Sequence, residues 1–207
     1  MARDTHSIVK MSRRESYALH PKAHKALVKR PTIPGQHGNS RGGMRNKASQ
    51  YSLQLREKQK VKRLYGLLEK QFSNLMKEAS RKQGQSGQVL LQFLELRLDN
   101  AVYRAGFAPS RRSARQLVTH GHFTLNGTRV DVPSIRVKVG DEVVIREHSK
   151  SSEYFKKLDD TSPAPATTPE WLKVDRKKIM VKVSAVPART DAEPDINEQL
   201  IVEYYSR

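Results

Sequence analysis

The sequence predicts an α+β fold, in which a mainly helical domain carries an inserted module of two helices and a β-hairpin and a basic, extended N-terminal arm precedes both. Three observations support this fold class. Apolar residues recur at helical spacing in two stretches, an Asn-Gly pair lies within a short alternating run, and basic residues crowd into the first third of the chain. We assign residues 1–50 to the arm, 51–94 and 151–207 to the helical body with a C-terminal segment, and 95–150 to the module.

The charge of the chain predicts a polyanionic partner. Its 207 residues include 39 Lys and Arg against 21 Asp and Glu, which gives a net charge of +18. Residues 1–63 alone hold 16 basic and 3 acidic residues and few apolar ones, so this third can bury little of its own surface. Phosphates would supply its counter-charges and release counterions on binding. The alternative is a basic tail that only faces solvent.

Several function classes are excluded by what the sequence lacks. No apolar run approaches the ~18 residues of a membrane span, the N-terminus has no hydrophobic signal core, and there is no Cys. We therefore expect a cytoplasmic protein with no membrane contact. A P-loop, a dinucleotide-binding glycine motif and a nucleophile elbow are also absent, so we expect neither an enzyme nor a cofactor. His20 and His24 could share a helical face as a metal pair, but no Cys or nearby carboxylate completes such a site, so we expect no metal.

Helices are predicted in three places. Apolar residues from Val61 to Ala79 follow steps of three, four and one, typical of an amphipathic helix, and the stretch Gly84 to Gly87 breaks the pattern. A second apolar stripe runs from Leu94 to a stop at Gly106. A third, short helix begins after the N-cap Ser110 and ends at Gly121.

Strands are predicted after the third helix. Asn126-Gly127 between alternating residues indicates a hairpin, because both turn residues must reach positive φ. Val137 to Ile145 supplies a further strand. Residues 159–169 are rich in proline and read as a surface linker or an extended excursion, and the run 177–183 can return to a core. The last run, 200–205, fits strand or helix.

The polar residues of the module form a candidate RNA-binding face. Arg97, Asn100 and Arg104 are spaced i, i+3 and i+7 on one helix, away from its apolar stripe, and Arg111 and Arg115 share a face of the next. The start of that second helix adds free amide groups, which favour an anion, and arginine can grip a phosphate with two bonds. The candidates are Arg97, Asn100, Arg104, Arg111, Arg112, Arg115, His120, His122 and Asn126. The alternative is a solvated face of ion pairs with Glu95 or Asp99.

RNA fits this face better than DNA. Proteins recognise A-form RNA mainly through its shape, its phosphates and its unstacked junctions. A rigid module that carries arginines and a flexible basic arm suit this kind of recognition. The sequence shows neither a zinc-finger pattern nor a repeated element that would bind two DNA half-sites.

Five separated motifs resemble the family of bacterial small-subunit ribosomal protein four. They are Pro-Gly-Gln-His-Gly at 34–38, the run 55–66 that begins Leu-Arg-Glu-Lys-Gln, Arg-Leu-Asp-Asn-Ala-Val-Tyr-Arg at 97–104, Ser-Ala-Arg-Gln-Leu-Val at 113–118, and the ending 195–207. The resemblance covers most of the chain and implies a primary binder of the 5′ domain of small-subunit rRNA that nucleates assembly. It further implies contact with small-subunit proteins three and five and an influence on translational accuracy. Some members of the family also repress translation of their own operon mRNA, so the resemblance raises this role as well.

The resemblance extends the candidate RNA-binding residues beyond the module. Those in the arm and the first long helix are Arg13, Arg14, Gln36, His37, Arg41, Arg45, Lys47, Lys58, Lys62 and Arg63. Many family members carry a zinc site with Cys-x-x-Cys before Arg-Arg-Glu, whereas here Val9 and Ser12 precede Arg13, so the chain resembles a zinc-free branch.

Two other classes carry the same kind of module. An RNA-modifying enzyme would need a catalytic domain, for which residues 151–207 leave too little room. A regulatory or stress factor does not account for the basic first third.

Overall fold

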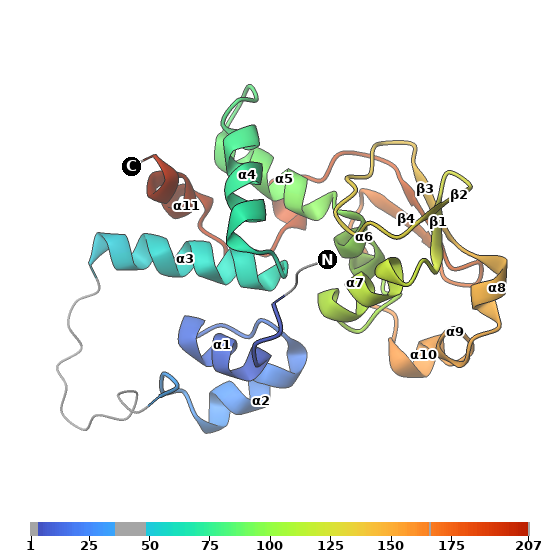
Figure 1. Ribbon diagram of the computed structural model, residues 1–207, viewed down its shortest axis with the longest axis horizontal. Coiled ribbons are helices and arrows are strands. Elements are labelled where there is room, and N and C mark those ends of the chain that lie inside the picture. The colour runs from blue at the N-terminus through green and yellow to red at the C-terminus, as the bar shows by residue number, and fades with distance from the viewer. Residues whose placement is uncertain (1–3, 36–48, 166, 207) are drawn as a thin grey trace. The chain divides into compact units, whose positions relative to one another are not determined.

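A computed structural model describes residues 4–35, 49–165 and 167–206 and divides the chain into two compact units (Figure 1). The first unit comprises residues 1–90 and 195–207, and the second comprises residues 91–194. Helices and an antiparallel sheet are both present, which confirms the α+β class. No helix within the described ranges is long and apolar enough to cross a bilayer.

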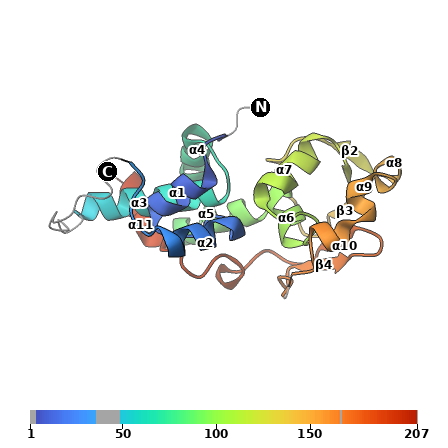
Figure 2. The ribbon, with the colours of Figure 1, turned by 90° about the horizontal axis from the view of Figure 1, so that it is seen from below.

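The first unit is helical. Its elements are α1 (Ile8–Glu15), α2 (Pro21–Lys29), α3 (Gln50–Leu64), α4 (Glu69–Ala79), the start of α5 (Ser86–Glu95) and α11 (Glu198–Tyr205). The long helix α3 packs against both α1 and α11, and α11 lies alongside it (Figure 2). Val61, Phe72 and Ile201 are fully buried in this unit. The last run of the chain, which the pattern left open, is therefore a helix.

The described part of the arm is folded rather than extended. Residues 8–29 form α1 and α2, which pack together and bury Met11, Leu19 and Ala23. The imidazole Nδ1 of His20 accepts a hydrogen bond from the amide of Lys22 at 3.0 Å and thereby caps α2. These apolar residues, together with ion pairs from Arg56 and Arg63 of α3 to Glu15 of α1, hold the helix pair, which the low apolar content of the arm concealed.

The helix predicted from Val61 to Ala79 is broken in two, which corrects that prediction. Gly66 takes a φ of 67°, the amide of Leu67 donates to the carbonyl of Lys62 at 2.9 Å, and the amide of Gly66 donates to that of Arg63 at 3.2 Å. These two bonds form a Schellman cap, which ends α3 and turns the chain into α4. The apolar spacing continues across the break, since Val61 and Leu64 of α3 and Phe72, Met76 and Ala79 of α4 are all buried.

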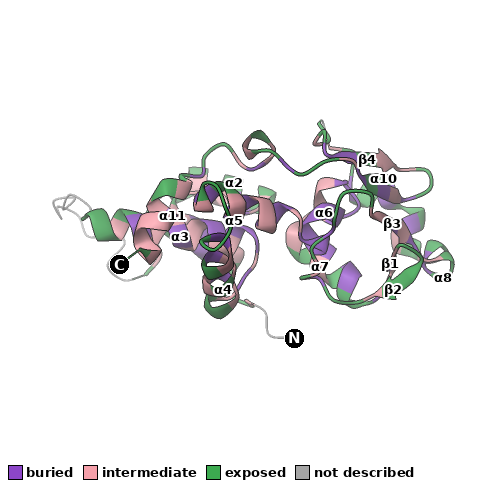
Figure 3. Cartoon of the chain, turned by 90° about the horizontal axis from the view of Figure 1, so that it is seen from above, coloured by how far each residue is buried: buried purple, intermediate pink, exposed green. Residues whose placement is uncertain are grey.

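The second unit combines helices with a five-stranded antiparallel sheet in the order β2-β1-β3-β5-β4. Its helices are α6 (Leu98–Arg104), α7 (Arg111–Thr119), α8 (Glu147–Lys150), α9 (Glu153–Lys156) and α10 (Leu158–Thr161). Its strands are β1 (Phe123–Leu125), β2 (Thr128–Val130), β3 (Glu142–Ile145), β4 (Leu172–Asp175) and β5 (Met180–Val183). The core gathers Phe107, Phe123, Trp171 and Val181, and α6 contributes buried residues from Leu98 to Val102, drawn in purple in Figure 3.

The module extends further along the chain than the boundary at residue 150. Strand β5 pairs with β3, with Val143 opposite Val181, so residues 151–194 belong to the second unit and not to the helical body. Pairing between strands this far apart leaves no local pattern in the sequence, which explains the misplaced boundary.

The proline-rich segment is tied to the module rather than free. The hydroxyl of Ser162 donates to the carbonyl of Gly106 at 3.0 Å, and Arg176 donates to the same carbonyl at 3.0 Å and to that of Ser162 at 2.8 Å. Residues 162–165 therefore run along the end of α6 as an extended excursion.

The turn and cap signals predict the local structure of the module correctly. The hydroxyl of Ser110 accepts a bond from the amide of Ser113 at 3.2 Å and starts α7. Asn126 and Gly127 have φ values of 50° and 83° and join β1 to β2. The second apolar stripe is split, however, because Arg97 is extended and bridges Arg136, so α5 ends before α6 begins.

Candidate nucleic-acid interface

Glu95 is the centre of the polar cluster on α6. Its carboxylate is 1% exposed, accepts two bonds from Arg104 at 2.8 and 3.0 Å and one from the side-chain amide of Asn100 at 2.7 Å. A buried carboxylate requires such partners, because an unpaired buried charge is costly. Glu95 therefore fixes the directions of Asn100 and Arg104.

Asp99 organises a second cluster beside the first. Arg97 donates to both of its carboxylate oxygens, at 3.0 and 2.7 Å, and Arg115 of α7 approaches one of them at 3.4 Å. The planar guanidinium of Arg97 thus forms the two-bond pair that arginine makes with carboxylates. The contact of Arg115 with Asp99 links α7 to the start of α6.

Arg111 joins the two clusters to a distant part of the unit. Its Nε donates to the side-chain oxygen of Asn100 at 2.9 Å, its Nη2 donates to Glu193 at 3.1 Å, and its guanidinium lies 4.7 Å from the ring centre of Tyr103. Arg104 also approaches Glu193, at 3.5 Å. The start of α7 is thereby held by charge-assisted bonds.

These contacts correct the expected orientation of the arginine face. Arg97 is 4% exposed and Asn100 is 2% exposed, so neither lies on the solvent-facing surface that helical spacing indicated. The alternative of ion pairs with Glu95 and Asp99 is realised, although the pairs are buried rather than solvated. Spacing along a helix shows which residues share a face, but not that Glu193 returns to cover it. Contact of these residues with RNA stays a prediction.

Exposed polar side chains that can contact phosphate lie at both ends of α7. Arg112 is exposed in its first turn, and His120 is exposed just after its end. Sequence reasoning missed Arg129 of β2, which lies against Gly121, where an added Cβ would be 2.7 Å from its Nε. The alternation of β2 after the Asn-Gly turn could have pointed to Arg129 as an outward residue.

His122 and Asn126 have structural partners. Nδ1 of His122 lies 3.0 Å from the hydroxyl of Ser149, and burial lowers the pKa of His122, helped by the positive charges of His120 and Arg146. Asn126 donates to Asp141 at 2.8 Å and accepts from the amide of Glu142 at 2.9 Å.

Asn126 therefore clamps the hairpin to β3. His122 favours the neutral imidazole at pH 7, which can make hydrogen bonds but no charge contact with phosphate.

The first unit contains a concave, basic site. A cavity of about 800 Å³ is bordered by Lys10 and Arg14 of α1 and by Lys62 and Arg63 of α3, with Leu67 at its apolar wall. Lys10 and Arg14 are both exposed and stand one turn apart. The structure thus brings the predicted Arg14, Lys62 and Arg63 together and adds Lys10, which sequence reasoning missed.

Lys58 differs from this set because it is interior. It is 3% exposed, its Nζ lies 2.8 Å from Glu69, and the same Nζ lies 4.2 Å from the ring centre of Tyr204 in α11. Burial alone would raise the pKa of Glu69, but hydrogen bonds from Lys58, Lys62 and Tyr205 outweigh it and lower that pKa to about 2. The predicted outward role of Lys58 is therefore corrected to a bond between α3, α4 and α11.

The neighbouring residues of α1 also divide into interior and surface groups. Arg13 donates to the carbonyls of Arg30 and Thr32, at 3.1 Å each, and holds the chain that follows α2. Glu15 is buried between Arg63 and Arg56, and burial raises its pKa despite these cations. Five predicted residues, Gln36, His37, Arg41, Arg45 and Lys47, lie outside the described residues.

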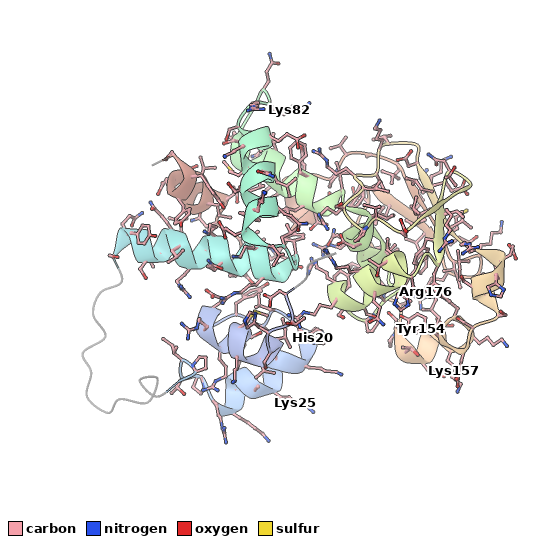
Figure 4. All side chains as sticks on the ribbon, viewed as in Figure 1. His20, Lys25, Lys82, Tyr154, Lys157 and Arg176 are labelled. Atoms are coloured by element: carbon pink, nitrogen blue, oxygen red, sulfur yellow. The ribbon has the colours of Figure 1, made fainter. Side chains whose placement is uncertain are left out.

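The exposed side of α2 carries three lysines. Lys22, Lys25 and Lys29 are all exposed, and Lys25 points outward in Figure 4. The sequence contains no acidic residue between Glu15 and Glu57. A surface of this kind attracts a polyanion and depends strongly on salt.

Comparison with known proteins places this geometry in one family. Residues 3–95 match the model of the ribosomal protein S4/S9 N-terminal domain, and residues 96–143 match the S4 domain. The chain is 50% identical to small ribosomal subunit protein uS4 of Chlorobaculum tepidum over 208 residues and 50% identical to that of Clostridioides difficile over 213 residues, with all of each chain covered. It is 48% identical to uS4 of Roseiflexus sp. over the full length of both. The predicted resemblance is confirmed, and the chain belongs to the uS4 family of small ribosomal subunit proteins.

Proposed function

We propose that this protein is a structural, non-catalytic constituent of the small ribosomal subunit in the cytoplasm and that it binds small-subunit rRNA. The observation that carries this proposal is the full-length match, at about half identity, to relatives named small ribosomal subunit protein uS4. The net charge of +18 and the exposed lysines of α2 support it, because both suit an RNA backbone.

The finer role follows from the motifs that the chain shares with its family. The protein is a primary binder of the 5′ domain that nucleates subunit assembly, contacts small-subunit proteins three and five and, through protein five, affects translational accuracy. Repression of its own operon mRNA stays a prediction from the resemblance.

Within the module, buried polar groups hold the structure and exposed polar groups bind RNA. Arg97, Asn100, Arg104 and Arg115 hold α6 and α7 in one arrangement through Glu95 and Asp99, and exposed cations of the same surface contact phosphates. A surface held in place before binding loses less conformational entropy when it meets its partner. The exposed residues to which we assign phosphate contact are Arg112, His120 and Arg129 in the second unit and Lys10, Arg14, Lys22, Lys25 and Lys29 in the first.

Stepwise reconstitution tests the assembly role. The full-length protein, added alone to naked small-subunit rRNA, should bind before any other protein is present, and its omission should reduce incorporation of the later 5′-domain proteins. Binding only to rRNA that already carries other proteins would contradict primary binding, while leaving membership of the particle intact.

A further inference from the structure

The hairpin formed by β4 and β5 carries an excess of positive charge that is hidden when the charges of residues 151–207 are counted together. Residues 172–183 contain five basic residues and one acidic residue, although residues 151–207 as a whole hold 9 basic and 10 acidic residues. The hairpin also lies beyond the S4-domain match, which ends at residue 143. None of the predicted RNA-binding residues comes from it.

Two lysines of this hairpin face each other across the strands. Lys173 of β4 is paired in register with Lys182 of β5, and both are exposed. Directly opposite side chains in an antiparallel pair have Cβ atoms about 4.5–5.5 Å apart, and like charges at this spacing are destabilising. Within the described part of the chain, neither ammonium group takes part in an ion pair. On its other side Lys182 is in register with Glu142 of β3, so this row of the sheet holds two positive charges and one negative charge. The row keeps a net positive charge that an anion would relieve.

The other two charged side chains of the hairpin, Asp175 and Arg176, stabilise its structure and do not neutralise the lysines. Asp175, its one acidic residue, accepts a bond from the amide of Lys178 at 3.1 Å and so closes the turn. Arg176 donates to the carbonyls of Gly106 and Ser162 and, at 2.8 Å, to Asp159. The positive charge of Arg176 is thereby used to fasten the hairpin to the end of α6.

The turn presents two more lysines. Ile179 is 8% exposed and has a φ of 50°, a conformation that β-branched residues rarely adopt, so burial of its side chain holds the turn in this shape. Lys177 and Lys178 precede it and are exposed at the tip of the hairpin. Four ammonium groups therefore project from one anchored hairpin.

We propose that Lys173, Lys177, Lys178 and Lys182 form a second phosphate-binding surface of the protein, which grips the RNA backbone without reading its sequence. The proposal rests on the proposed rRNA binding. Lysine acts as a flexible point charge for phosphate, and it is depleted in the cores of protein interfaces, which favour aromatic anchors. The outward residues of the next row, Met180 of β5 and Val144 opposite it in β3, are half-buried and offer no such anchor. An RNA backbone fits this surface better than a protein partner.

A charge-matched pair of variants tests this surface. The double variant K173Q/K182Q and the control K156Q/K157Q each remove two exposed charges from the second unit, the control from the region of α9. Binding of each full-length protein to a 5′-domain rRNA fragment is measured across a salt series. The hairpin variant should weaken binding and reduce the magnitude of the slope of log K against log salt by about 1.4 to 1.8, whereas the control should keep the wild-type slope. The melting temperature should change little, because the double variant removes both the repulsion between the two lysines and the attraction between Lys182 and Glu142.

The outcomes separate the two proposals. Equal slopes for both double variants, with tight wild-type binding, would overturn the phosphate surface and leave the proposed function standing. Absence of preferential wild-type binding would instead count against the proposed function. An unchanged rRNA slope together with lost binding of another small-subunit protein would assign the lysines to a protein interface and overturn the inference.

Discussion

At the scale of single residues, buried carboxylates decide where the arginines of the module point. Glu95 and Asp99 are 1% and 4% exposed, and each is bonded to at least two polar partners. Helical spacing placed Arg97, Asn100 and Arg104 on one face, but Asn100 and Arg104 bond to Glu95 whereas Arg97 bonds to Asp99. The spacing could not predict that Glu193 contacts Arg104 and Arg111, because Glu193 lies 82 residues after Arg111 and only the folded chain brings the two together.

Replacing Glu95 tests the role of this cluster. Glu95→Ala leaves Arg104 and Asn100 without their buried acceptor, so the second unit should lose about 3–5 kcal/mol of unfolding free energy. Denaturant unfolding of the full chain measures the loss. Glu153→Ala, which removes an exposed pair with Lys157, should cost below about 1 kcal/mol. Equal losses of unfolding free energy in the two variants would show that the buried bonds of Glu95 stabilise the unit no more than an exposed ion pair does.

The low pKa of Glu69 gives a pH dependence with a defined sign. Its pKa is about 2 in the folded protein and 4.5 in a free chain, so its contribution to stability is complete above pH 4.5 and disappears as pH falls toward 2. The melting temperature of Glu69→Gln should therefore lie below wild type at neutral pH, and the two should converge in acid. A difference that stays constant from neutral pH to about pH 2 would contradict this assignment.

Arg112 tests phosphate contact at a single exposed residue. Arg112→Gln should weaken rRNA binding and reduce the magnitude of the salt slope by about 0.7 to 0.9, the value for one phosphate contact. The control Lys157→Gln should leave the slope unchanged. If the two variants behave alike, Arg112 only faces solvent.

At the scale of elements, the ends of helices explain which predictions succeed. Caps are local, so Ser110 and the Asn126-Gly127 turn could be read from the sequence. The break at Gly66 was missed because the apolar spacing continues through it. The break before Leu98 was missed because it depends on a backbone bridge to Arg136.

The N-cap of α7 should make a measurable contribution to stability. Ser110→Ala removes the acceptor for the amide of Ser113, and the second unit should lose about 1 kcal/mol of unfolding free energy. Ser110→Asp, which can accept the same bond, should retain most of the stability. A loss as large in the Asp variant as in the Ala variant would show that the side-chain bond does not matter.

At the scale of the whole molecule, charge and fold are distributed differently over the two units. The first unit holds 21 basic and 8 acidic residues, and the second holds 18 and 13. The composition predicted the strongly basic part correctly. The sheet that joins residues 142–145 to 180–183 could not be predicted, because its pairing depends on contacts between distant segments.

The central claim is that this chain recognises small-subunit rRNA and does not merely attract polyanions. The most direct test is binding of the full-length protein to a 5′-domain fragment across a salt series, with tRNA and duplex DNA as competitors. The account predicts tight binding to the fragment that survives both competitors at salt concentrations where non-specific binding is lost. Equal binding of all three nucleic acids, falling together as salt rises, would contradict it and show that net charge alone drives the association.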